Sequence, residues 1–241
     1  MGEGMSSDAA IMPYISSANI ACGYHAGDQD TMKRTIHYCL ENGVAIGAHP
    51  SYNDRADFGR RDLLGSAVRM DEIPELITTQ LNTLQNLCLA FGTRLHHVKP
   101  HGALYNRAAR DLDVAILICE AVRTFDPALA FYGLSGSHMK TAATMSQLRF
   151  ASEVFADRAY AEDGSLVPRS QAGSLIETEK DCEEQVLRMV QNGEVLTLPA
   201  GKPRPVNADT ICIHGDGPKA IDFAKAVYHC LNRYHIGLKA L

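Results

Sequence analysis

Four short apolar runs in this chain each end at a histidine that lies beside a glycine or a proline. The four histidines are His25, His49, His101 and His214. Short continuous apolar runs are typical of buried parallel strands, and the carboxyl ends of such strands are where α/β folds carry their chemistry. Histidine at those positions acts as a proton carrier near neutral pH or as a metal ligand. The pattern predicts an enzyme whose four histidines converge on one pocket at the carboxyl ends of a parallel sheet or barrel.

Segments with helical periodicity alternate with apolar runs along the chain. Helices are predicted over 28–42, 71–91, 111–124, 177–192 and 218–234, and strands over 44–48, 95–98, 129–132, 148–155 and 210–214. This alternation predicts βαβ units around a parallel sheet. A TIM-like β/α barrel is favoured over an open doubly wound sheet, because candidate residues follow many strands. No shift in composition marks a boundary, so we expect one domain over residues 1–241.

The composition excludes several classes of protein. The 241 residues are 46% hydrophobic and 21% charged with a net charge of −5, which is typical of a soluble globular protein. No basic stripe or nucleic-acid motif is present, so we expect no nucleic-acid partner. No apolar run approaches the length of a membrane span, and no signal segment opens the chain, so a cytoplasmic location is expected.

The seven cysteines are widely separated and include no C-x-x-C pair. This spacing predicts reduced cysteines that serve in packing. Cys22 and Cys212 lie near strand ends, where a nucleophilic role is the alternative.

Two segments at strand ends carry groups suited to acid–base chemistry. Lys99 and His101 flank Pro100, where an ammonium group and an imidazole can stabilise an oxyanion and transfer a proton; the alternative is a surface turn with incidental charges. Glu153 and Asp157 lie near the end of another strand. Arg158 is free to pair with one of them as a structural ion pair, or with a substrate carboxylate.

Two long connections, over 51–70 and 156–176, are rich in arginine, aspartate and aromatic residues. Connections of this length are usually functional lids or disordered segments. We expect substrate-closing loops, with Phe58 covering the substrate and Arg60 or Arg61 anchoring the closed form.

Taken together, the motifs resemble those of the LamB/YcsF family, in the same order and over nearly the whole chain. The matching blocks are NIACGYHAGD at 19–28, GAHP at 47–50, FGRR at 58–61, KPHGALY at 99–105, EVFADR at 153–158 and HGD at 214–216.

The resemblance implies a seven-stranded β/α barrel related to polysaccharide deacetylases. It also implies an ATP-dependent 5-oxoprolinase in which this chain is the A subunit, with partner subunits B and C and a small-molecule substrate. ATP is then a co-substrate of the complex. Because this chain has no G-x-x-x-x-G-K-[ST] loop, we expect a partner to perform the phosphorylation.

We assign the candidate residues to two roles. The predicted catalytic residues are His25, His49, Lys99, His101, Glu153, Asp157 and His214. The predicted substrate-binding residues are Asn19, Arg60, Arg61, Tyr105, Arg158 and Asp216. Among them, Lys99 and His101 are expected to stabilise charge and move protons at the lactam carbonyl, and Arg158 is expected to pair with the substrate carboxylate.

The chain departs from the family pattern at its start. Family members open with a strand that carries an Asp shortly before a Gly-Glu pair, and Gly2-Glu3 corresponds to that pair here, without the strand. In the related deacetylases this Asp joins two histidines at a metal. His25 and His49 correspond to those histidines, so a metal site here lacks its third ligand. Two alternatives remain: a metal-dependent deacetylase or amidohydrolase that uses His25 and His49, and a non-catalytic lactam-binding subunit.

Overall fold

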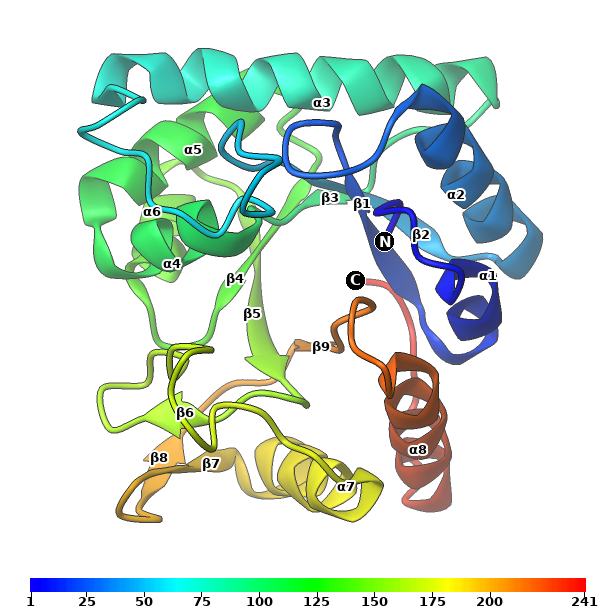
Figure 1. Cartoon of the computed structure of the whole chain (residues 1–241), viewed down its shortest axis with the longest axis vertical. Coiled ribbons are helices and arrows are strands. Elements are labelled where there is room, and N and C mark those ends of the chain that lie inside the picture. Colours follow the sequence, from blue (N-terminus) through cyan, green and yellow to red (C-terminus); the bar gives the residue numbers. More distant parts are fainter.

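The computed structural model describes residues 1–241 and is organised around a parallel sheet of six strands. The strands, in spatial order, are β1 (Ser17–Ala21), β2 (Ala45–His49), β3 (His97–Val98), β4 (Ala130–Leu134), β5 (Arg149–Phe155) and β9 (Thr210–Cys212). Every neighbouring pair is parallel. Figure 1 shows the sheet curling into a half-barrel.

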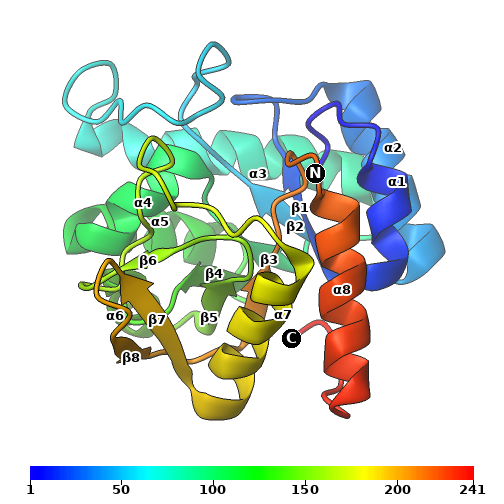
Figure 2. The same cartoon turned by 60° about the horizontal axis from the view of Figure 1, so that its bottom comes forward.

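Helices follow most of the strands. They are α1 (Asp8–Ile11), α2 (Gln29–Asn42), α3 (Ile73–Ala90), α4 (Gly102–Arg110), α5 (Leu112–Phe125), α6 (His138–Met145), α7 (Glu179–Leu187) and α8 (Ala220–Arg233). Figures 1 and 2 both show α8 beside α1, so the last helix of the chain packs against its first. None of these helices combines the length and the apolar character that a membrane span requires.

The predicted parallel α/β architecture is confirmed, but the six strands form a half-barrel and not the closed seven-stranded barrel that the resemblance implies. β1 and β9 are the two edges of the sheet. The residues before β1 form α1 and a short 3₁₀ turn, and Met1 alone pairs with the edge of β1: its nitrogen donates to Asn19 O at 2.8 Å and its oxygen accepts from Ala21 N at 2.9 Å. A separate small sheet, β6 (Tyr160–Ala161), β7 (Glu194–Leu198) and β8 (Pro203–Pro205), interrupts the chain between β5 and β9.

Local signals in the sequence explain where the helices begin and end. The Asp28 side chain caps α2 by accepting from Thr31 N at 2.8 Å, and Gly43 ends the helix at a φ of 65°. The expected helix over 28–42 is therefore confirmed, as are those over 71–91 and 111–124. α4 and α6 were not predicted, because they are short and follow directly on strand ends.

One apolar core of 46 buried residues holds the helices against the sheet. All five residues of β4 are buried, as expected for a central strand of a parallel sheet. Removal of this apolar surface from water is the main favourable contribution to folding.

Glycine at position 47 permits a close approach between β2 and β3. A Cβ atom there would lie 2.0 Å from Nε2 of His97, which is fully buried, stacks on Tyr132 and donates to Asn19 Oδ1 at 2.9 Å. His97 therefore has a structural role, and it cannot move aside without losing both contacts.

Gly47→Ala is expected to destabilise the protein by about 1–3 kcal/mol, the usual cost of overpacking a core. Urea denaturation gives the measurement. Gly237→Ala is the control, since a Cβ there meets no atom within 4 Å. Equal stability of the two variants would contradict the packing described at β2.

Candidate active site

A cavity of about 1050 Å³ is lined by residues from both ends of the strands, including those that follow their carboxyl ends. Ten of the predicted site residues line it: Asn19, His49, Arg60, Lys99, His101, Tyr105, Glu153, Arg158, His214 and Asp216. His25 and Asp157 lie directly behind this wall, each in contact with a lining residue. Arg61 points elsewhere and pairs with Asp54 and Asp57 of its own loop, at 2.6 and 2.7 Å.

Three of the four histidines pack against one another. The rings of His25 and His101 stack with centroids 3.8 Å apart, and His49 meets His101 edge-on at 4.7 Å. Burial lowers the pKa of His25 and of His49, and it lowers that of His101 to about 3. Burial thus disfavours the charged form of all three imidazoles.

Backbone carbonyls fix the orientation of two of these rings. Nδ1 of His49 lies 2.7 Å from Lys99 O, and Nε2 of His101 lies 2.8 Å from Phe58 O. Phe58 has a φ of 55°, a left-handed conformation that is uncommon for a bulky residue and turns this carbonyl toward the ring. The opposite nitrogens, His49 Nε2 and His101 Nδ1, face each other at 3.0 Å.

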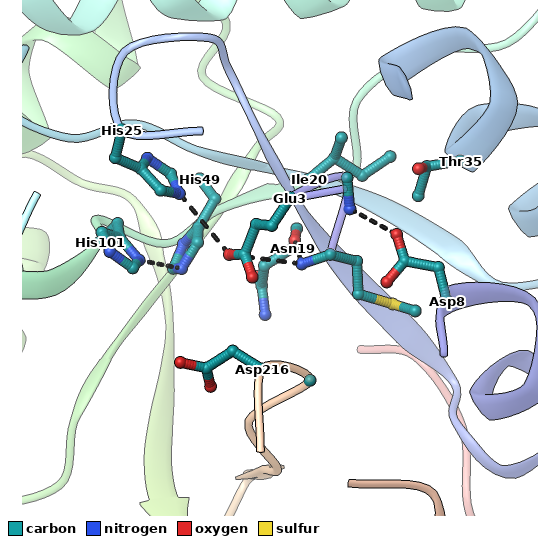
Figure 3. Close-up of polar contacts among 12 residues, drawn as sticks. Glu3, Asp8, Asn19, Ile20, His25, Thr35, His49, His101 and Asp216 are labelled. Carbon is teal, nitrogen blue, oxygen red and sulfur yellow. Dashed lines mark hydrogen bonds and ion pairs between the residues drawn. The ribbon is translucent and has the colours of Figure 1, made fainter. Parts of the chain in front are cut away.

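Glu3 joins the histidines from the start of the chain (Figure 3). Its Oε1 lies 3.6 Å from Nε2 of His25, and its side chain is only 8% exposed. Glu3, His49 and His101 offer ligand atoms that all lie within 4.8 Å of one another, so these three could hold a metal ion.

The set of possible metal ligands in the structure differs from the set that the resemblance implies. His25 and His49 were expected to be the metal-binding pair with no third ligand available, whereas the structure groups His49 with His101 and supplies Glu3 as the carboxylate. The sequence identifies Glu3 only as part of a Gly-Glu pair in the family pattern and does not predict that it reaches the histidines. The two flanking glycines were the available signal: Gly2 and Gly4 have φ values of 69° and 84°.

Lys99 and Glu153 form a buried ion pair between β3 and β5. Lys99 Nζ lies 2.7 Å from Glu153 Oε1 and 3.0 Å from Cys212 Sγ, and Tyr105 donates its hydroxyl to Glu153 Oε2 at 2.8 Å. Burial alone would lower the pKa of Lys99, but the neighbouring Glu153 carboxylate outweighs burial and raises it, so the ammonium group is charged. Burial raises the pKa of Cys212 to about 12, which argues against its alternative role as a nucleophile.

Asp157 and His214 form a second pair, at the end of β9. His214 Nδ1 lies 2.9 Å from both carboxylate oxygens, and its backbone N–H donates to Oδ2 at 3.1 Å. Burial would raise the pKa of Asp157, but the bonds with His214 lower it and keep the carboxylate charged. A carboxylate bound at Nδ1 leaves the Nε2 lone pair of His214 available as a proton acceptor.

The connection over 51–70 contacts the histidine cluster, whereas Arg158 of the connection over 156–176 lies at the cavity wall. Phe58 packs on His25 and His101, with ring centroids 5.3 Å apart in both cases, and Arg60 pairs with Asp216 at 2.6 Å. These contacts fit the predicted lid. Arg158 lines the cavity, but it also donates to Val167 O at 2.6 Å within its own connection; its role toward a substrate carboxylate stays a prediction.

Parallel strands, a cavity that reaches their carboxyl ends, and buried imidazoles, carboxylates and an ammonium group around it together define a protein of the α/β enzyme class. The chain belongs to the LamB/YcsF family, whose sequence profile matches residues 1–241. The resemblance drawn from the motifs is thus confirmed.

Three known proteins illustrate the relationship. The 5-oxoprolinase A subunit of Shouchella clausii (strain KSM-K16) is 49% identical over 97% of this chain and 90% of its own length. That of Bordetella parapertussis (strain 12822 / ATCC BAA-587 / NCTC 13253) is 47% identical over 98% and 92%. A crystal structure of the lactam utilization protein from Thermus thermophilus superposes with a TM-score of 0.90 at 39% identity, over 99% of this chain and 94% of that one.

Lys99→Met is expected to destabilise the protein by about 3–5 kcal/mol, because it leaves the Glu153 carboxylate buried without its cation. Glu153→Gln should cost a similar amount, and the double variant less than the sum, as measured by urea denaturation. The control is Glu194→Gln, which breaks a partly exposed pair with Arg188 and should cost less than about 1 kcal/mol. Strictly additive losses would show that the two groups do not depend on each other.

Proposed function

We propose that this chain is the A subunit of a 5-oxoprolinase, in which it opens the ring of 5-oxo-L-proline to L-glutamate in an ATP-coupled reaction. The observation that carries the proposal is the pair of buried assemblies, Lys99–Glu153 and Asp157–His214, at one cavity in a chain 49% identical to a protein of that name. In this proposal residues 1–241 act as one catalytic domain.

The reaction explains why such groups are needed. Resonance stabilises the lactam amide, so its carbonyl must be activated before water attacks. Transfer of the terminal phosphoryl group of ATP to the carbonyl oxygen provides that activation. One water then opens the ring at the C–N bond, and a second releases phosphate. The sum is 5-oxoproline, ATP and two waters giving glutamate, ADP and phosphate.

The side chains around the cavity fit separate parts of this sequence. The Lys99 ammonium group stabilises negative charge on the carbonyl oxygen, and Glu153 and Tyr105 hold it in place. His214 accepts a proton from the attacking water through Nε2, with Asp157 fixing its tautomer. Arg158 pairs with the substrate carboxylate at the cavity wall.

The proposal assigns phosphorylation to partner chains, subunits B and C. The chain contains no G-x-x-x-x-G-K-[ST] loop, the usual cradle for nucleotide phosphates. Its buried charged groups instead line one cavity. ATP is in this view a co-substrate of the assembled enzyme.

Asp157→Asn is expected to lower the kcat of the assembled enzyme by about 10²–10⁴, because an amide cannot hold His214 in the tautomer that accepts a proton at Nε2. Glutamate formation gives the rate. Asp113→Asn, at an exposed position in α5, is the matched control and should leave the rate unchanged. Near-normal turnover by Asp157→Asn would remove this pair from the mechanism.

The isolated chain is expected to hydrolyse neither ATP nor 5-oxoproline at a useful rate, and activity should appear when subunits B and C are added. The measurement is ADP and glutamate release with each combination of chains. ATP-coupled ring opening by this chain alone would contradict the dependence. Hydrolysis of an N-acetyl substrate without ATP would instead favour the metal-dependent deacetylase alternative.

A further inference from the structure

The protons on His49 and His101 can be counted from their hydrogen bonds. A carbonyl oxygen only accepts, so the nitrogens that face Lys99 O and Phe58 O must both carry N–H groups. A neutral imidazole has a single N–H. The two nitrogens that face each other at 3.0 Å, His49 Nε2 and His101 Nδ1, therefore both present lone pairs.

Two lone pairs at this distance repel each other unless a cation lies between them. A proton would meet the need only by converting one ring to an imidazolium, which burial of the rings opposes. The third neighbour, the Glu3 carboxylate, adds negative charge within 4.8 Å of a ring nitrogen of each histidine. Three electron-pair donors therefore lie close together. The Met1 ammonium group is 3.7 Å from Glu3 Oε1, on the carboxylate rather than between the two imidazoles.

His25 adds a fourth lone pair beside this cluster. Its Nδ1 lies 2.9 Å from the Ser51 hydroxyl, which itself donates to Tyr52 O at 2.9 Å and so must accept from the ring. The remaining nitrogen, Nε2, is buried without a hydrogen-bond partner and faces Glu3 (Figure 3). A buried polar atom without a partner is costly, and this one lies 3.6 Å from Oε1 of Glu3, the carboxylate of the same cluster.

The geometry points to a site for a divalent transition-metal ion of the Zn²⁺ type, bound by a carboxylate oxygen of Glu3, Nε2 of His49 and Nδ1 of His101. Two histidine nitrogens and one carboxylate oxygen are a donor set of catalytic zinc sites. Ligands about 2.1 Å from such an ion lie roughly 3.0–3.4 Å apart, and the two nitrogens are already at that spacing.

Two further features support the assignment. Both histidines donate their remote N–H groups to backbone carbonyls, the contact that fixes ring orientation in known metal sites. Glu3, His49 and His101 also line the cavity, so the ion would keep an open side toward the substrate. When bound, it would supply Lewis-acid polarisation of a carbonyl oxygen. This gives His101 a ligand role in place of the proton transfer predicted from the sequence.

The test is metal binding by the full chain, which is independent of oxoprolinase activity. Protein stripped with a chelator is titrated with Zn²⁺ by calorimetry, and Co²⁺ is added separately to read the visible absorption bands of nitrogen coordination. We expect about one ion per chain and a rise in Tm with Zn²⁺. Mg²⁺ should bind far more weakly, because it prefers oxygen ligands.

Variants locate the ion. His101→Ala should abolish stoichiometric Zn²⁺ binding, and Glu3→Gln, which keeps the side-chain shape, should weaken it at least tenfold. The matched control is His214→Asn, a cavity histidine outside the group, which should bind Zn²⁺ as tightly as the parent chain. The proposal is overturned if the parent chain binds no Zn²⁺ stoichiometrically, or if binding survives His101→Ala and Glu3→Gln unchanged.

Discussion

The common direction of the six strands is the constraint on which the candidate site depends. Because all of them run parallel, the residues that follow β1, β2, β3 and β9 lie at the same end of the sheet, the end where the strands finish. His25, His49, His101 and His214 are far apart in the sequence, yet each lies at or shortly after the end of one of these strands. If one of these strands ran in the opposite direction, its histidine would lie at the other end of the sheet, away from the other three.

Buried charged groups make this site suited to acid–base chemistry, but their burial costs folding free energy. Lys99 and Glu153 are both almost fully buried, and each is tolerable only because the other lies 2.7 Å away. Asp157 depends in the same way on His214. In the proposed reaction, a substrate carbonyl would meet groups that are already oriented and shielded from water, so that little reorganisation is needed as charge develops.

The sequence was sufficient for the parts of the fold that depend on local signals. The Asp28 cap and the glycine at 43 marked α2, and the apolar runs before the four histidines marked the strands. The sequence could not indicate which residues meet at the site through tertiary contacts. The glycines beside Glu3 indicate an unusual local conformation, but they do not indicate that Glu3 meets His49 and His101, because that contact arises only when the first residues fold back against β1. The resemblance implied seven strands in a closed barrel. That β1 and β9 remain the two edges of a six-stranded sheet depends on long-range pairing, which local signals do not report.

The contact between Arg60 and Asp216 has a consequence for how the protein is made. It joins residues 156 positions apart, and Asp157 and His214 are separated by 57. During synthesis, the three clustered histidines can assemble long before β9 and its loop leave the ribosome. The nascent chain therefore passes through a stage with a formed histidine cluster and an open, unfinished cavity wall. The Asp157–His214 and Arg60–Asp216 contacts form only when the last sixth of the chain docks, so a chain terminated near residue 200 lacks both.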